Sequence, residues 1–259
     1  MIYAYALTDP AGINFVAVQR HRRRCVERVS QKTLEQCSGD GHYRPSPYQR
    51  NDINDNLGEE NGLPTSLVPS LLEVNKQIHG EGSDILYGNE LVFADTIALY
   101  AFIINLGPAS ASHLKKIRLK GWGRGRTSKA YNNACFAVLI WATSLEKFSI
   151  DTRIGWHGTP KLNAQQFYRD AFPWLEAVGA AKGKYNAAID ILEISDVDLG
   201  TYFWHRYIHG SNITSQSPSA EEKLKAFRSE LSRNLLSQQK HVMRKSNKRR
   251  KVSKVSDDS

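Results

Sequence analysis

The sequence predicts an α/β protein, because short segments with alternating apolar residues recur between longer segments of helical periodicity. Three of these segments have the form L-x-x-L-x-L, where L is a large apolar residue: residues 114–119, 145–150 and 189–194. Each follows a stretch typical of a helix and precedes a loop. Strands that alternate with helices favour parallel pairing. The chain has 259 residues, 41% of them hydrophobic, and is long enough to bury one core.

The N-terminal part predicts a short helix, a strand and a long loop. Residues 1–7 are apolar enough for a helix end, and Asp9-Pro10 breaks it. Residues 13–18 predict a strand. Residues 38–62 are rich in Gly, Asn, Asp and Pro and hold few apolar residues, which indicates a disordered loop.

The middle of the chain carries the expected core. Apolar residues recur at roughly helical spacing between residues 67 and 86, and residues 91–93 predict a strand. A helix is expected from residue 96 to about 106, where Gly-Pro stops it. Helices at 128–142 and 162–181 would cover the apolar positions of the L-x-x-L-x-L strands.

The C-terminal part predicts a linker, one helix and a charged tail. Residues 211–219 are rich in Ser, and the next segment has one apolar stripe. The expected organisation is an N-terminal segment (1–37), a disordered loop (38–62), an α/β core (63–210), a linker (211–219), a helix (220–245) and a disordered basic tail (246–259).

The three L-x-x-L-x-L segments resemble the strand of leucine-rich repeats. They begin 31 and then 44 residues apart, whereas regular leucine-rich repeats are about 20–29 residues long. Two interpretations therefore stay open. One is a short, irregular leucine-rich-repeat-like core, and the other is three separate half-buried strands of an α/β sheet. Both predict parallel strands.

Two segments carry a family resemblance. They are residues 2–9 (IYAYALTD) and residues 71–93, which include LLEVNKQI, ILYGN and LVF. They resemble signatures of a large family of fungal proteins with an F-box-like N-terminal region. The resemblance implies an F-box-like helical start within residues 1–37. It also implies a substrate receptor of ubiquitin ligation, which would bind a ubiquitin-ligase adaptor.

The positive charge is concentrated near the C-terminus. The net charge is +9, and eight Lys or Arg residues with no acidic residue lie between Lys240 and Lys254. Short Lys/Arg-rich stretches are typical of nuclear-localisation signals or nucleic-acid contacts. The predicted nuclear-localisation residues are Lys248, Arg249, Arg250 and Lys251, with a nuclear import receptor as partner. A second basic cluster, at residues 20–24, could help the tail to bind nucleic acid.

A glycine-rich loop follows one predicted strand and opens a predicted helix, where phosphate-binding loops lie. Its possible phosphate contacts are Gly121, Gly123, Arg124, Gly125 and Arg126. The spacing is G-x-G-x-G and not the G-x-G-x-x-G of dinucleotide sites. The alternative is a flexible connection with no ligand.

The sequence shows no constellation typical of acid–base or nucleophilic catalysis. The three cysteines, Cys25, Cys37 and Cys135, are too scattered for a zinc site, so no metal or cofactor is expected. No apolar run approaches the length of a membrane span, and no membrane partner is expected. The leading prediction is a nuclear protein-interaction module that is not an enzyme. The alternatives are a nucleic-acid-associated protein and an enzyme that binds a phosphorylated ligand at residues 121–126.

Overall fold

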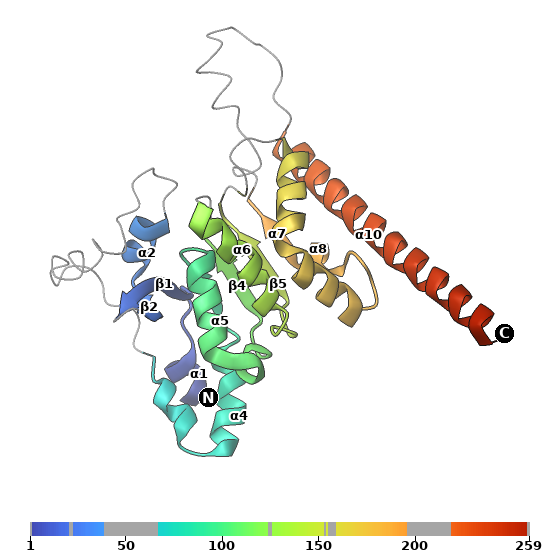
Figure 1. Cartoon of the computed structure of the whole chain (residues 1–259). Helices are drawn as coiled ribbons and strands as arrows, with labels where there is room; N and C mark the ends of the chain where they lie inside the picture. Colours follow the sequence, from blue (N-terminus) through green and yellow to red (C-terminus); the bar gives the residue numbers. More distant parts are fainter. Residues whose placement is uncertain are drawn as a thin grey trace, which may run out of the picture.

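The chain folds as a mixed α/β protein around a six-stranded, mostly parallel sheet (Figure 1). The computed structural model describes residues 2–20, 23–38, 67–123, 126–152, 154, 159–195 and 219–257. The α/β class predicted from the sequence is confirmed. The elements are α1 (Ile2–Leu7), β1 (Ile13–Arg20), β2 (Arg23–Val29), α2 (Gln31–Ser38), η1 (Pro69–Glu73), α4 (Lys76–Leu86), β3 (Glu90–Phe93), α5 (Thr96–Ala111), β4 (Lys116–Leu119), α6 (Arg126–Leu139), β5 (Lys147–Ile150), α7 (Pro160–Ala181), α8 (Ala187–Ile191), β6 (Leu192–Ile194) and α10 (Ala220–Asp257).

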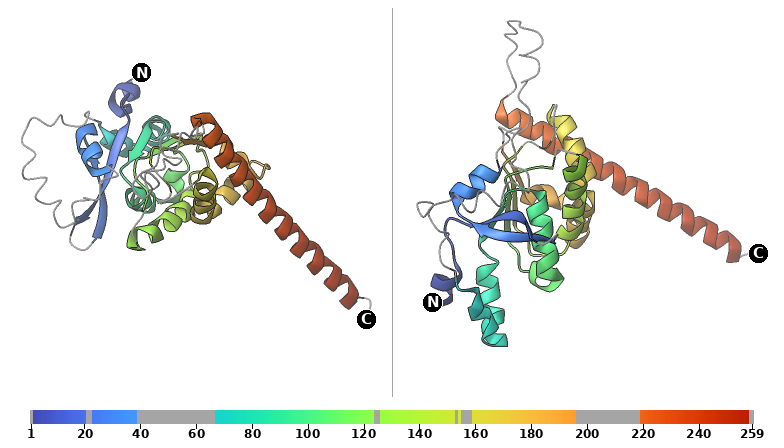
Figure 2. Two further views of the ribbon diagram at one scale, coloured as in Figure 1. Left: turned by 90° about the horizontal axis from the view of Figure 1, so that it is seen from above. Right: turned by 60° about the vertical axis from the view of Figure 1, so that its left-hand side comes forward.

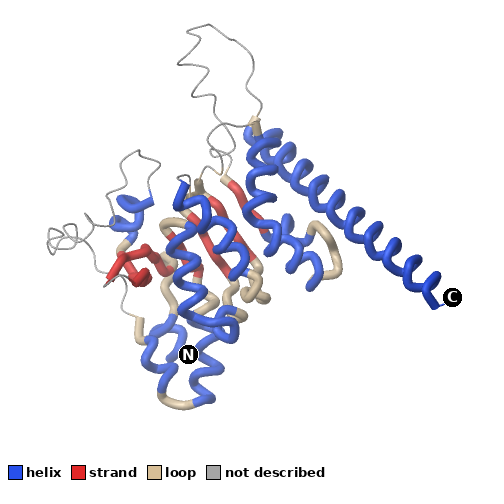
Figure 3. The backbone as a smooth tube through the Cα atoms, in the orientation of Figure 1, coloured by secondary structure: helices blue, strands red, loops and turns tan. Residues whose placement is uncertain are grey.

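The parallel strands lie in the order in which the chain makes them. The sheet order is β2-β1-β3-β4-β5-β6, and every pair from β1–β3 to β5–β6 is parallel. Crossover connections between parallel strands are almost always right-handed. When each new strand is added at the same edge of the sheet, the connecting helices therefore all lie on one face. Helices α5, α6 and α7 accordingly lie on the same side of β3–β6 (Figure 3).

The side chains that alternate along the strands build the core on that side. Apolar pairs from each strand face the helices: Leu91 and Phe93, Ile117 and Leu119, Phe148 and Ile150, Leu192 and Ile194. The rings of Phe136, Phe167 and Trp174 fill the layer between sheet and helices, with centroids 5.5–5.9 Å apart around Phe136. The three L-x-x-L-x-L segments thus supply β4, β5 and β6, which are neighbours in the sheet.

The N-terminal segment begins with the short helix α1 and then joins this same sheet, and the F-box-like character implied by the family resemblance stays a prediction. Strand β1 pairs with β2 in an antiparallel hairpin and with β3 in parallel. Helix α2 covers the face opposite α5–α7 at this end, where Leu34 and Cys37 pack against Val16 and Val92. Val16 and Val18 alternate along β1 with residues that point to the other face of the sheet. This period of two is typical of a strand.

Helix α5 bends where the sequence predicts a stop. Gly107 has a φ of 76°, a left-handed value that side chains with a Cβ rarely adopt, and Pro108 cannot donate a backbone hydrogen bond. The chain nevertheless resumes a helical turn and continues to Ala111. Asp95 caps the start of α5, because its Oδ1 accepts a hydrogen bond from the N–H of Ala98.

Helix α10 is longer than predicted. It begins at Ala220 as expected, but it continues to Asp257, through the segment predicted to be a disordered tail beyond residue 245. The physical reason is composition, because residues 220–257 contain neither Gly nor Pro, and Lys, Arg and Gln are good helix formers. Phe227 and Leu231 pack its first half against α7, and its second half extends away from the body (Figures 1 and 2).

The predicted loop at 38–62 and linker at 211–219 lie outside the described residues, apart from Ser38 and Ser219. Among the helices that the structure describes, none combines the length and the apolar character needed to cross a bilayer.

Candidate functional site: the polar face of the sheet

The face of the sheet turned away from α5–α7 is polar from β3 to β6. Residues at every second position of the strands point to this face, because strand side chains alternate. In the register, Val92 lies beside Arg118, Arg118 beside Ser149, and Ser149 beside Glu193. We call this surface the polar face, and its charged or hydroxyl residues are Glu90, Lys116, Arg118, Lys120, Lys147, Ser149, Asp151 and Glu193.

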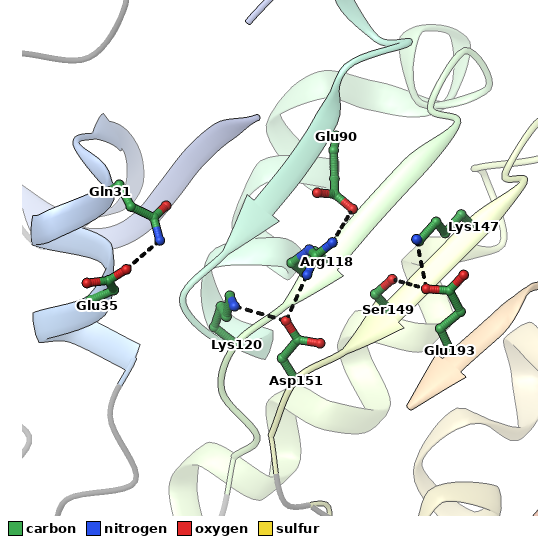
Figure 4. Close-up of polar contacts among 9 residues, drawn as sticks. All are labelled: Gln31, Glu35, Glu90, Arg118, Lys120, Lys147, Ser149, Asp151 and Glu193. Carbon is green, nitrogen blue, oxygen red and sulfur yellow. Dashed lines mark hydrogen bonds and ion pairs between the residues drawn. The ribbon is translucent and has the colours of Figure 1, made fainter. Parts of the chain in front are cut away.

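Arg118 connects three strands at the centre of the polar face (Figure 4). Its Nη2 donates to Oε1 of Glu90 on β3 at 2.9 Å, and its Nη1 donates to Oδ2 of Asp151 after β5 at 3.0 Å. Lys120 Nζ donates to the same Asp151 oxygen at 2.9 Å. A guanidinium can bridge two carboxylates because its donors form a planar fork.

A second polar group links β5 to β6. Lys147 Nζ lies 2.8 Å from Oε2 of Glu193, and Ser149 Oγ donates to that oxygen at 3.1 Å (Figure 4). The side chain of Glu193 is 57% exposed. This group therefore sits at the open end of the polar face, within reach of a partner.

The ion pairs shift the pKa values of the residues on this face. The hydrogen bond to Glu90 raises the pKa of Arg118, against the opposing effect of burial. Burial alone would raise the pKa of Asp151, but Lys120 and Arg118 outweigh it and the pKa is lowered. The hydrogen bond from Lys147 lowers the pKa of Glu193. These shifts keep Arg118, Asp151 and Glu193 charged at neutral pH, so the polar face presents charges of both signs.

The side chains of the polar face remain partly open to solvent. Arg118, Lys120 and Asp151 keep 25–31% of their side-chain surface exposed, and Lys116 is exposed. Within the described part of the chain, α2 packs on this side only near β1 and β3. Parallel sheets are usually covered on both faces, so a polar second face that no helix of the described residues covers beyond β3 is a departure that suits binding.

The first half of the predicted phosphate loop is buried and already hydrogen-bonded. Gly123 donates its N–H to Oδ1 of Asn132 at 3.1 Å, and its carbonyl accepts from Nδ2 of Asn132 at 2.9 Å. Trp122 is only 5% exposed and belongs to the core, and Gly121 is buried as well. Arg124 and Gly125 lie outside the described residues, as does the side chain of Arg126. The amide of Gly123 is therefore not available to a phosphate.

Asn132 is the centre of a buried network behind that loop. It is fully buried, and its Oδ1 also accepts from Oγ1 of Thr96 at 2.9 Å. Its Nδ2 also donates to Oδ2 of Asp170 at 3.3 Å. Asn132 thus ties α5, α6, α7 and the loop after β4 together, which is a structural role.

Other predicted residues fall into two groups. Lys248, Arg249, Arg250 and Lys251 belong to α10, and their side chains lie outside what the structure describes. Cys135 is fully buried, and burial, with a contribution from Asp95, raises the pKa of its thiol, so it is a core residue and not a nucleophile. In the described residues no cluster of His, Cys, Asp or Glu could hold a metal ion.

The polar face was not predicted from the sequence, although a signal was present. Arg118 and Asp151 are far apart in the chain, and only the register of β4 and β5 brings them together. The variable positions of the three L-x-x-L-x-L segments carry the charged or hydroxyl side chains of this face: Lys116 and Arg118, Lys147 and Ser149, Glu193. Aligning the segments by their apolar positions would have placed these side chains on one face.

Comparison with known proteins finds no family model that matches the chain, and no curated protein or solved structure matches it significantly.

Proposed function

We propose that this chain is a protein-interaction module that binds a folded protein partner through the polar face. The observation that carries the proposal is the one-sided sheet. Helices cover one side of β3–β6, and the described part of the other side presents partly exposed charges. A surface of this kind costs little to keep in water and can become the centre of an interface.

The charges on the polar face favour a protein over a nucleic acid. Glu90, Asp151 and Glu193 are interspersed with the cations and would repel the phosphates of a polyanion. A protein surface with cations and carboxylates of its own can complement such a pattern. Electrostatic complementarity of this type contributes specificity and association rate more than raw affinity.

A finer proposal is a substrate receptor of ubiquitin ligation with a leucine-rich-repeat-like core, acting in the nucleus. Three features support it. The L-x-x-L-x-L segments form neighbouring parallel strands, the helices lie on one side of them, and the family resemblance implies an adaptor-binding start. In this proposal the polar face takes the substrate, and the basic stretch at residues 248–251 takes the import receptor.

The test is affinity purification of the full chain from its own cells, compared with a charge-swapped variant. Lys147→Glu with Glu193→Lys preserves the ion pair between β5 and β6 but reverses the field that a partner meets. We expect partners of the wild type to be lost by about tenfold or more, as for interface charges that oppose like charges. Recovery of a ubiquitin-ligase adaptor would support the finer proposal.

A matched control keeps the result specific to the polar face. Lys184, in the turn after α7, and Asp190, on α8, form an exposed ion pair at 2.8 Å. The swap Lys184→Glu with Asp190→Lys makes the same chemical change there and should leave the partners unchanged. If the two swapped variants retain the same partners as the wild type, the polar face is not the binding surface and the proposal fails.

A further inference from the structure

The two edges of the sheet differ in length and in cover. Strand β6 has 3 residues, and the carbonyl of Leu192 in it accepts a hydrogen bond from Nη2 of Arg228 on α10 at 3.5 Å. Strand β2 has 7 residues and pairs with β1 over its whole length. In the described part of the chain, no strand pairs with the outer side of β2. The longer edge is therefore the one left open.

The register shows which backbone groups of β2 point outward. Along a strand, the N–H and carbonyl of successive residues point to opposite sides. The carbonyl of Phe15 on β1 accepts a hydrogen bond from the N–H of Ala94, on the side of β3. The next residue, Val16, therefore faces β2, where Glu27 is its partner in the register. We call the side of β2 that points away from β1 the open edge, and its outward residues are Arg24, Val26 and Arg28.

The open edge lacks the usual protection of an exposed strand. Natural proteins protect such edges with proline, a β-bulge or charged side chains. Strand β2 contains no proline, and its register with β1 skips no residue. Its outward arginines are held against the body instead. Nη2 of Arg28 donates to Oδ2 of Asp9 at 2.8 Å, and the Cζ of Arg24 lies 4.3 Å from the ring centre of Tyr131 on α6.

The backbone at the centre of the open edge is thus left to a partner. Val26 is half-buried, and no hydrogen bond from another described residue reaches its outward N–H or carbonyl. A free N–H and a free carbonyl on the same side of a strand are what a further strand pairs with. The open edge is also separate from the polar face, because β1 lies between β2 and β3 (Figure 2).

We propose that the open edge binds an extended, acidic segment of a protein partner by strand addition. A peptide added to a sheet edge gains affinity from main-chain hydrogen bonds and specificity from its alternate side chains. Opposite charges that face each other across a strand pair stabilise the pair. Arg24 is exposed and has no carboxylate partner among the described residues, so an Asp or Glu opposite it would complement its charge. No Asp or Glu lies between Asn14 and Val26, whereas Arg occurs 4 times there.

The measurement is fluorescence anisotropy of a labelled peptide, Thr-Glu-Val-Glu-Val-Glu-Thr, titrated with the full chain. Val26→Pro removes the outward N–H, and proline is tolerated where an edge strand faces solvent, so β2 should stay paired with β1. This variant should bind the peptide at least about tenfold more weakly, because proline removes a hydrogen bond and blocks the approach of a strand. Val26→Thr keeps both the N–H and the β-branched shape and should bind within about twofold of the wild type.

The charge is tested by a matched pair of variants. Arg24→Gln should lower the affinity about two- to fivefold, as expected for the loss of one cross-strand charge pair. Lys182→Gln removes an exposed cation at the end of α7 and should leave the affinity unchanged. Equal affinities of these two variants would overturn the acidic character of the partner.

Strand addition is also tested without any change to the protein. The same peptide with a methyl group on every backbone nitrogen keeps its charges but cannot donate main-chain hydrogen bonds, and it should bind at least about tenfold more weakly. This comparison decides the result if denaturation shows that Val26→Pro does not fold. The inference is overturned if the methylated peptide binds as well as its parent, or if polyglutamate competes equally. It is also overturned if the chain forms dimers that Val26→Thr keeps and Val26→Pro dissociates, with no peptide bound.

Discussion

The two faces of the parallel sheet are built from the same strands but are held by different forces. On the helix side, Phe136 and Phe148 are fully buried among other rings. On the polar face, Arg118 and Asp151 are joined by ion pairs that solvent can reach. Removing a large buried apolar side chain costs about 2–5 kcal/mol, whereas an exposed ion pair contributes about 0–1 kcal/mol. The helix side therefore supplies most of the stability of the sheet, and the polar face supplies little of it.

The largest expected effect tests the helix side. Phe136→Ala removes a ring that contacts Trp122, Phe148, Phe167 and Trp174 in a fully buried position. The free energy of unfolding should fall by about 4 kcal/mol, because the cavity cannot collapse among fixed rings. Chemical denaturation measures this change. Ile140→Ala, at a 40% exposed side chain just after α6, should cost less than about 1 kcal/mol.

The second effect tests the polar network inside the helix layer. Asn132→Leu leaves the N–H and the carbonyl of Gly123, together with Thr96 Oγ1, without their buried partner. Unsatisfied buried groups cost about 1–3 kcal/mol each, so we expect a loss of about 3 kcal/mol after partial relaxation. The neighbouring, exposed Asn133→Leu is the control and should change stability by less than about 1 kcal/mol. Equal losses of stability in the two variants would contradict the structural role of Asn132.

The smallest effect tests the polar face and depends on pH. The folded pKa of Asp151 lies below its ordinary value of 3.8, so its ion pairs add stability above that pH and lose it as pH falls through the folded pKa. Asp151→Asn should cost less than about 1 kcal/mol at pH 7, because the pair is partly exposed. Urea midpoints at several pH values should show the difference from wild type shrinking in acid. A difference that grows in acid would contradict the assigned sign.

Much of the fold could be predicted because the apolar residues that become buried recur in the sequence with the period of a strand or a helix. Strands β4, β5 and β6 each have apolar residues at alternating positions, and the helices between them have apolar stripes. Strand β2 was not predicted, because Arg23–Val29 reads as a charged segment and is stabilised by pairing with β1. The end of α10 was placed too early, because a run of like charges was taken as disorder, although no residue in it breaks a helix.

The candidate sites were harder to predict than the fold, since they depend on register and not on periodicity. Glu90 and Arg118 lie on two strands and Asp151 follows a third, and no local pattern connects them. The same holds for Arg24 and Tyr131, which are brought together by a hairpin and a helix distant in sequence. By contrast, Gly121 and Gly123 form a conspicuous local motif, but their surroundings are buried.

The sequential order of the strands has a consequence for how the chain can assemble during synthesis. The pairs Glu90–Lys116 and Lys116–Lys147 close loops of only 26 and 31 residues, so each strand emerging from a ribosome meets a partner made just before it. The pair Ile13–Leu91 closes 78 residues, at an entropic cost about 1 kcal/mol higher. The hairpin of β1 and β2 is made first and must wait for β3.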